Sequence, residues 1–403
     1  MRPRTRARLL PLALAVAMVV VAGCGSDEPS SSSGGGASQG FTPPSVPMLQ
    51  SLGAGEGKVN LVAWAGYVED GSTDKTVDWV TPFEKETGCQ VNVKVAATSD
   101  EMVQLMKSGQ YDAVSASGDA SLRLIAGGDV APVNTDLVEN YADVFDDLKL
   151  KPWNSVNGKA YGIPHGRGAN LLMWRTDVVK PAPDSWGVVF DPASPYKGKV
   201  TAYDSPIYIA DAALYLKATK PELGITNPYE LDDKQFQASV DLLKQQAGLV
   251  GEYWSDYAKA VQAFKSGSTV LGTTWQIIAN LAEADKAPVK AILPKEGSTG
   301  WSDTWMVSAK AANPNCAYRW MNHVISPKVN AQVAEWFGEA PANRKACQET
   351  ADKQHCTIFH AADEAYFAKV AWWTTPITEC GDGRGRVCKD YSAWTTAWTE
   401  IKG

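Results

Sequence analysis

Residues 293–305 read LPKEGSTGWSDTW, a glycine-rich turn followed by an aromatic and an acidic side chain. Side chains two residues apart in a strand point to the same side, so Trp301 and Asp303 share a face if the segment is extended. An indole face attracts positive charge, and a carboxylate accepts hydrogen bonds from N–H donors. The pair therefore suits an organic cation, although a surface turn beside a core tryptophan is the plainer alternative.

The composition limits the classes of function. The chain has 403 residues, 44% of them hydrophobic, which is enough for two domains with sizeable cores. Its net charge of -7 argues against a nucleic-acid partner, because binding a polyanion needs a basic face. The 15 tryptophans are an unusually large number, and one use of so many is to stack against ligands.

The first 23 residues have the layout of an export signal. Arginines at positions 2, 4, 6 and 8 precede the apolar residues 9–22, and VAGC at 21–24 resembles a bacterial lipobox. Residues 1–23 are thus the expected lipoprotein signal peptide, with Cys24 as the lipid attachment site; an ordinary signal with an incidental cysteine is the alternative. Acyl chains would hold the protein on the outer face of the cytoplasmic membrane. Residues 24–57, rich in serine and glycine, are predicted to be a flexible tether.

Six cysteines remain after Cys24, and an even number in an exported chain indicates disulfides. Of the 15 pairings that six cysteines allow, we favour the one that joins near neighbours. It comprises Cys380–Cys388 and Cys347–Cys356, and it pairs the two remaining cysteines as Cys89–Cys316. With these cysteines oxidised and no CxxC motif present, neither a metal site nor a cofactor is expected.

Strand-like and helix-like segments alternate from residue 58 onward. KVNLVAW (58–64), QVNVKVA (90–96) and YDAVS (111–115) have the pattern of strands. Apolar spacing predicts a helix over 73–86, and the capping box TSDE opens a second helix over 98–107. This order predicts a largely parallel sheet flanked by helices.

Four candidate side chains fall just beyond the ends of these strands. Ligands of open α/β sheets lie beyond the carboxyl ends of the strands. The residues at these positions are Trp64, Tyr67, Ser117 and Asp119. Core packing would equally explain Trp64, and a helix N-cap would explain Asp119.

Six short motifs, in this order, resemble the substrate-binding proteins of polyamine (spermidine/putrescine) ABC transporters. They are AWAGYV (63–68), YDAV (111–114), AYGIP (160–164), YKGK (196–199), LGTTW (271–275) and PKEG with WSD (294–303). The resemblance covers about residues 59–341. It implies an α/β fold of the periplasmic-binding-protein type, with two lobes and a ligand cleft at the hinge. We assign 58–168 plus 302–340 to lobe 1, and 169–301 plus 341–403, with a disulfide-rich tail, to lobe 2.

The resemblance also implies which side chains bind the ligand. Carboxylates would satisfy the ammonium groups once water is expelled, and aromatic faces would pack against the methylenes between them. The implied ligand-binding residues are Trp64, Tyr67, Ser117, Asp119, Asp204, Trp275, Trp301 and Asp303. Arg167 and Trp254 are further candidates.

Three positions depart from the family pattern. Ile207 stands where the family often has a second acid, and Asp119 stands where an aromatic is common. Asp119 could replace the missing acid. Arg167 stands where another aromatic is common; it could pair with Asp119, hold a ligand carboxylate, or face solvent. The identity of the solute therefore remains open between a cation and a zwitterion.

The expected function is that of a monomeric, non-enzymatic receptor that captures a small organic cation, foremost a polyamine, by hinge closure. An ABC permease and its ATPase are the partners that the family implies. One alternative keeps the receptor fold and binds a zwitterion or carboxylate through Arg167. Another is a carbohydrate- or cell-wall-binding lipoprotein that uses exposed tryptophans. A hydrolase is disfavoured because the sequence has neither a Gly-x-Ser-x-Gly elbow nor an HExxH motif.

Overall fold

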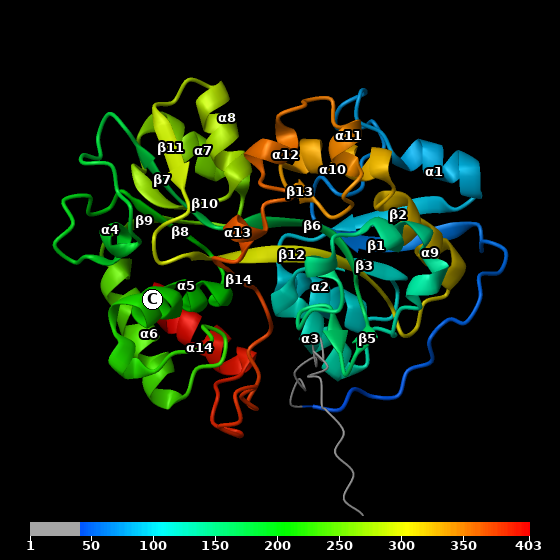
Figure 1. The fold of residues 1–403 in the computed structure, drawn as a ribbon, viewed down its shortest axis with the longest axis horizontal. Helices are drawn as coiled ribbons and strands as arrows, with labels where there is room; N and C mark the ends of the chain where they lie inside the picture. Colours follow the sequence, from blue (N-terminus) through cyan, green and yellow to red (C-terminus); the bar gives the residue numbers. More distant parts are fainter. Residues whose placement is uncertain (1–40) are drawn as a thin grey trace, which may run out of the picture. The chain divides into compact units, whose positions relative to one another are not determined.

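The computed structural model describes residues 41–403, which form an α/β fold around two larger β-sheets (Figure 1). The first sheet has seven strands in the order β13-β6-β12-β3-β1-β2, with β14 beside β12. Its strands are β1 (Lys58–Ala63), β2 (Gln90–Val95), β3 (Ala113–Ala116), β6 (Ile163–Ala169), β12 (Ser298–Val307), β13 (Ala340–Pro341) and β14 (Val370–Trp372). In Figure 1 the paired strands β6 and β12 run side by side across the middle of the view.

The second sheet has five strands in the order β11-β7-β10-β8-β9. They are β7 (Leu171–Arg175), β8 (Val200–Tyr203), β9 (Val250–Trp254), β10 (Leu271–Thr274) and β11 (Val289–Ile292). A small hairpin, β4 (Ser155–Val156) with β5 (Lys159–Ala160), stands apart from both sheets. The α/β class with two sheets agrees with the expectation.

Both sheets are mixed rather than largely parallel. The expected β–α–β units are present, since β1 pairs in parallel with β2 and β3, and β8 with β9 and β10. Antiparallel strands were missed: β12 runs against β3 and β6, and β7 runs against β10 and β11. The direction in which two strands pair cannot be predicted from local sequence when the strands are far apart in the chain.

Helices connect and cover the strands. The longer ones are α1 (Val80–Thr87), α2 (Ser99–Lys107), α3 (Gly118–Gly127), α5 (Ile209–Thr219), α6 (Asp233–Ala247), α7 (Tyr257–Ser266), α8 (Gln276–Ala284), α9 (Pro314–Val324), α10 (Pro327–Phe337) and α14 (Tyr391–Lys402). Short ones are α4 (Gly187–Phe190), α11 (Ala346–Glu349), α12 (His355–Ile358) and α13 (Glu364–Phe367). The 3₁₀ turns are Thr135–Leu137, Glu139–Asp143, Asp146–Leu148, Pro206–Tyr208 and Pro221–Leu223.

Local sequence explains where several helices begin and end. Thr98 accepts a hydrogen bond from the Glu101 amide and caps α2, as expected. The helix predicted over 73–86 begins only at Val80. Pro82 then lies in the first turn, where backbone N–H groups have no partner in the helix, so the proline does not interrupt the helical hydrogen bonds.

The chain passes from the first sheet to the second at Asn170, the one residue between β6 and β7. The Asn170 amide donates to the Thr299 carbonyl at 2.9 Å, and Trp275 Nε1 donates to Asn170 Oδ1 at 3.0 Å. The return passage is the turn at residues 293–297, which leads into β12. The first part of the segment 293–305 is thus one of the connections between the sheets, and the rest belongs to β12.

The three disulfides are the expected ones: Cys89–Cys316, Cys347–Cys356 and Cys380–Cys388. The tail that begins at Cys347 ends in α14, which packs against α6. Many tryptophans pack in the hydrophobic cores. Trp79, Trp186, Trp254, Trp305, Trp320 and Trp394 are fully buried.

The expected signal peptide, residues 1–23, and the lipid attachment site Cys24 lie outside the described residues. The described part of the expected tether, residues 41–57, has no helix or strand but lies against the folded body instead of running free. The Asn315 side chain accepts a hydrogen bond from the Gly53 amide at 2.6 Å, and the Glu56 carboxylate accepts one from the Cys316 amide at 2.9 Å. Within residues 41–403, no helix has the length and apolar character needed to cross a membrane.

Candidate ligand-binding site

A cavity of about 310 Å³ lies where strands of both sheets end. The residues after β1, β2 and β3 contribute to its wall, as do the last residue of β8 and the residues after β9 and β10, together with side chains of β12. The lining comprises Trp64, Ala65, Val95, Ala96, Ala97, Ser117, Tyr203, Ser255, Asp256, Tyr257, Trp275, Trp301, Asp303, Phe337 and Trp373. The cavity thus lies where ligands of open α/β sheets are expected, beyond the carboxyl ends of the strands.

Asp303 is the buried acid of this cavity, with 3% of its surface exposed. Ser117 Oγ donates to its Oδ1 at 2.6 Å, and the Tyr67 hydroxyl donates to its Oδ2 at 2.8 Å. Burial raises the pKa of Asp303 to about 6, while these two hydrogen bonds act in the opposite direction. Near neutral pH, Asp303 is therefore a desolvated carboxylate with room on its cavity side for a cationic donor.

Aromatic rings enclose the space beside Asp303. Trp275 and Trp301 meet edge to face with ring centroids 5.9 Å apart, and Trp301 meets Phe337 in the same way at 5.8 Å. Tyr203 stacks on Trp373 at 5.6 Å. Such walls offer apolar contact to an alkyl chain and attraction to a positive charge.

Two of the predicted acids are not part of the cavity lining. Asp204 Oδ1 accepts hydrogen bonds from Lys402 Nζ at 2.7 Å and from Trp398 Nε1 at 3.1 Å. Asp119 is only 1% exposed and accepts a hydrogen bond from Ser99 Oγ at 2.9 Å. Burial raises the pKa of Asp119 to about 6. Both carboxylates are thus engaged by other parts of the chain.

Three other candidates also stand back from the cavity. Arg167 is buried, forms an ion pair with Asp147 and donates to the Ala361 carbonyl at 2.9 Å. It therefore pairs with neither Asp119 nor a group in the cavity. Trp254 packs behind Trp275 with ring centroids 4.9 Å apart, and Tyr67 touches Asp303 from behind.

Sequence reasoning missed several lining residues. Asp256 is an exposed acid at the rim, and Tyr203, Phe337 and Trp373 complete the aromatic walls. The sequence did contain a signal for Asp256. Residues 254–256 have the same sequence, WSD, as residues 301–303, and they lie at the end of β9. For Trp373, which follows β14, only the fold shows that it reaches the cavity while Trp372 packs against Trp153.

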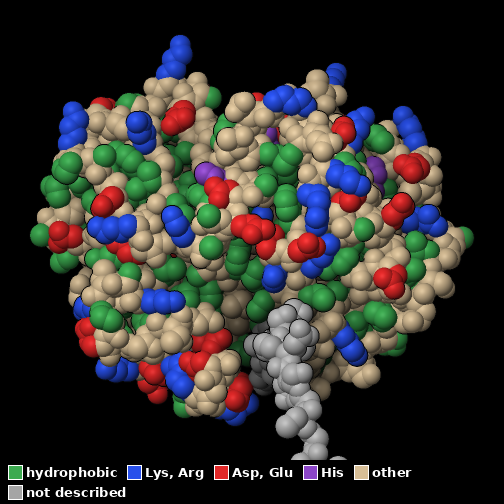
Figure 2. Space-filling model, in the orientation of Figure 1, with side chains coloured by type: hydrophobic (Ala, Val, Ile, Leu, Met, Phe, Trp, Pro, Cys, Tyr) green, Lys and Arg blue, Asp and Glu red, His purple; other side chains and the backbone are tan. Residues whose placement is uncertain are grey.

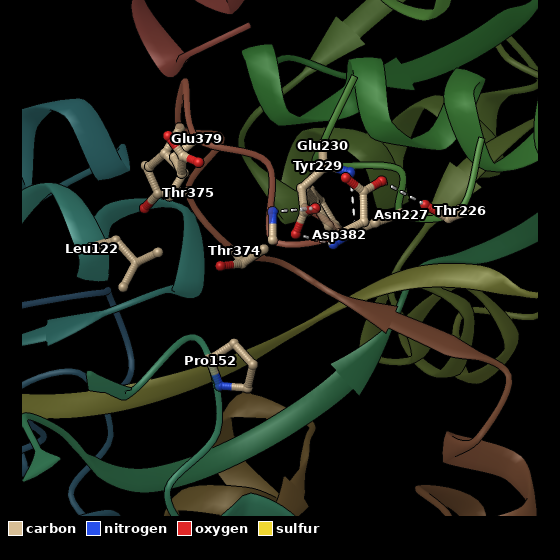
Figure 3. Close-up of a pocket in the computed structure, with 12 residues that line it drawn as sticks. Leu122, Pro152, Thr226, Asn227, Tyr229, Glu230, Thr374, Thr375, Glu379 and Asp382 are labelled. Carbon is tan, nitrogen blue, oxygen red and sulfur yellow. Dashed lines mark hydrogen bonds between the residues drawn. The ribbon is translucent and has the colours of Figure 1, made fainter. Parts of the chain in front are cut away.

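A second hollow of about 340 Å³ is lined by three acids, Glu230, Glu379 and Asp382, two of which have partners within the chain (Figure 3). Glu230 accepts hydrogen bonds from the Asn227 side chain at 2.8 Å and from the Gly381 amide at 2.8 Å. Asp382 is paired with Arg384. Because two of its three carboxylates already have partners and the first cavity has aromatic walls beside a buried acid, we favour the first cavity as the ligand site.

Comparison with known proteins identifies the family of the chain and agrees with its fold. Residues 78–362 match the family described as bacterial extracellular solute-binding proteins. The chain belongs to this family. The spermidine/putrescine-binding periplasmic protein of Escherichia coli is 27% identical over 287 residues, covering 70% of this solute-binding protein and 77% of the relative. The putrescine-binding periplasmic protein PotF of the same organism is 25% identical over 371 residues, covering 87% and 93% of the two chains.

Solved structures give the same fold. The TpPotD lipoprotein of Treponema pallidum matches with a TM-score of 0.69 at 16% identity, covering 86% of this solute-binding protein and 99% of the other chain. The two-lobe fold class and the resemblance to polyamine-binding proteins are thereby confirmed. Solute-binding proteins of transport systems are not an enzyme class, and the relatives named above are periplasmic.

Proposed function

We propose that this solute-binding protein is the receptor of an ABC importer and that it captures a small organic cation, foremost a polyamine such as putrescine or spermidine. The observation that carries the proposal is the buried carboxylate of Asp303 within walls of Trp275 and Trp301. The names of the curated relatives support the choice of polyamines.

The cavity suggests how the ligand lies. One ammonium would donate to Asp303, since a desolvated cation needs a charged acceptor. The alkyl chain would lie along the faces of Trp275, Trp301 and Tyr203, and a second amine would reach toward Asp256 at the rim. Of the predicted ligand-binding residues, Trp64, Ser117, Trp275, Trp301 and Asp303 keep this role in the proposal.

The proposal extends to closure and partners. We assign lobe 1 to 58–168 plus 302–340 and lobe 2 to 169–301 plus 341–403, and ligand binding stabilises the closed arrangement of the two. A lipid on Cys24 would hold the monomeric receptor on the outer face of the cytoplasmic membrane, next to its permease and ATPase. On the face shown in Figure 2, acidic and basic side chains are intermixed, and the described residues on this face form no basic patch of the kind that binds nucleic acid.

A zwitterion is the second candidate ligand. The indole N–H groups of Trp64, Trp301 and Trp373 are buried without an acceptor among the described residues, so they could donate to a ligand carboxylate. Arg167 is not needed for this reading, because it is occupied by Asp147. The cell-wall-binding alternative is disfavoured, because it needs exposed tryptophans and six of them are fully buried.

Calorimetric titration of the purified protein with putrescine, spermidine, glycine betaine and a panel of amino acids tests the proposal. A micromolar Kd corresponds to about -8.2 kcal/mol and is easily measured. We expect saturable 1:1 binding of a polyamine. Heat only with a zwitterion would support the second candidate, and no heat with any of these ligands would reject both.

A further inference from the structure

The hydroxyl of Tyr67 lies between two buried carboxyl groups. It is 2.8 Å from Oδ2 of Asp303 and 3.0 Å from Oε2 of Glu339. Tyr67 and Glu339 are fully buried and Asp303 is 3% exposed. A phenol has one proton and can donate to only one of the two carboxyl groups. The second short contact between oxygens therefore needs a proton from elsewhere.

The surroundings of the two acids indicate where this proton lies. Asp303 has a second donor, Ser117 Oγ at 2.6 Å, and it faces the cavity. The side chain of Glu339 has no such help, since its Oε1 lacks a hydrogen-bond partner. An ionised Glu339 would be a buried charge that shares at most one donor, which is a costly state. Asp303 is thus the better carboxylate and Glu339 the better acid.

Among residues 41–403, no positive charge offsets Glu339. His165 Nε2 is 3.8 Å from its Oε1, but burial lowers the pKa of His165 to about 3, so the ring is neutral. Trp305 donates to His165 Nδ1 at 3.0 Å, which leaves the ring proton on Nε2. His355, on the other side, contacts the Glu339 backbone carbonyl, and burial lowers its pKa as well.

The carboxyl group of Glu339 is also enclosed by backbone. A Cβ on Gly166 would come within 2.1 Å of its carboxyl carbon, so the absence of a side chain at Gly166 creates the space that the acid fills. Within the glycine-rich residues 161–168, Gly166 is thus required to leave room for the Glu339 carboxyl group. Burial and the nearby Asp303 raise the pKa of Glu339 well above its ordinary value.

We propose that Glu339 is a neutral carboxylic acid that donates its proton to Tyr67, so that Tyr67 directs its own proton to Asp303 and the floor of the cavity carries a single negative charge. The proposal rests on the proposed function in so far as Asp303 is the counter-charge of the ligand. Glu339 and Tyr67 are then positioning residues, and the floor accepts one ammonium rather than two. The remaining ionisable groups that face Asp303 are Asp119 and Tyr203, and neither is a cation.

The variant Glu339→Gln tests the charge state, because its amide can still donate to Tyr67 but cannot ionise. We expect the Kd of Glu339→Gln for putrescine at pH 7.5 to stay within about twofold of the wild-type value. The control variant Glu283→Gln, which replaces an exposed glutamate on α8, should give the same result. If Glu339 were ionised, its replacement would remove a negative charge from the site and weaken binding roughly tenfold or more, overturning the proposal. Tyr67→Phe should instead raise the pH at which binding is half lost, since Asp303 loses a donor.

A measurement without ligand separates this proposal from the proposed function. Infrared spectra of protein with ¹³C-labelled glutamate at pH 7.5 should contain the C=O stretch of a protonated carboxylic acid, and Glu339→Gln should lack it. A wild-type spectrum without this band would overturn the proposal whether or not an amine binds. A band that is present in a protein that binds no amine would count against the proposed function alone.

Discussion

Lys402 Nζ lies 2.7 Å from Oδ1 of Asp204, so an acid expected to meet the ligand is neutralised by the last turn of α14. Trp398, one turn earlier on the same helix, donates to the same oxygen at 3.1 Å. By pairing with Asp204, α14 neutralises one carboxylate on the side of the site that the second sheet forms. Asp303 remains the one acid of the cavity lining that is buried, and Asp256 is the exposed one.

The substitution Asp204→Asn should therefore change the Kd of the cationic ligand by no more than about twofold. The lost ion pair is partly exposed, and pairs of this kind contribute less than about 1 kcal/mol. Titration calorimetry of Asp204→Asn beside wild type checks this. A loss of tenfold or more would restore Asp204 to the ligand site.

Binding of the cation should weaken as the pH falls through about 6. Asp303 has a pKa of about 6 in the free protein, and only its ionised form attracts an ammonium group. Affinity should thus be constant above about pH 7 and decline roughly tenfold per pH unit below the pKa. Titrations between pH 5 and 8 test this, and an affinity that does not change across that range would mean that no titrating carboxylate holds the ligand.

The buried acids should make the ligand-free protein more stable to unfolding at pH 5 than at pH 8. Burial raises the pKa of Asp211 to about 7 and those of Asp119 and Asp303 to about 6, all above the unfolded value near 3.9. The folded state then binds more protons than the unfolded state between these values, so its stability falls as the pH rises through about 6 to 7. Denaturant unfolding at both pH values measures the difference. Asp211→Asn should reduce it, and an unchanged difference would mean that Asp211 does not titrate as described.

The disulfides should differ in their contribution to stability. Cys89–Cys316 joins residues 227 positions apart, whereas Cys380–Cys388 spans 8. In the chain-entropy description, the longer loop gives about 3 kcal/mol more stabilisation, because it restricts the unfolded chain further. Replacing both cysteines of each pair with serine, in separate variants, tests this by denaturant unfolding. Equal losses in the two variants would contradict the expectation.

Local patterns allowed much of the fold to be predicted. The first three strands, the capping of α2 and the position of the pocket follow from periodicity and from the rule that ligands lie beyond strand ends. Trp301 and Asp303, which were predicted to share a face, both line the cavity, because they lie two residues apart on one strand.

The predicted site residues that do not line the cavity are held by contacts between distant parts of the chain. Asp204 is engaged by Lys402, Asp119 by Ser99, and Arg167 by Asp147. A sequence shows that an acid or base follows a strand, but it does not show that a helix 198 residues away supplies its partner. The same limit hid Glu339, which becomes a neighbour of Asp303 only once β6, β12 and β13 are aligned.

The central claim, that the buried Asp303 carboxylate holds a cationic ligand, is tested most directly by titrating wild type and Asp303→Asn with the same polyamine at pH 7.5. The variant keeps the shape of the side chain and removes its charge. We predict that its Kd is more than tenfold higher, because a charged hydrogen bond of roughly 1.5–3 kcal/mol is lost. An unchanged Kd in a variant that unfolds like wild type would contradict the account and place the cation elsewhere.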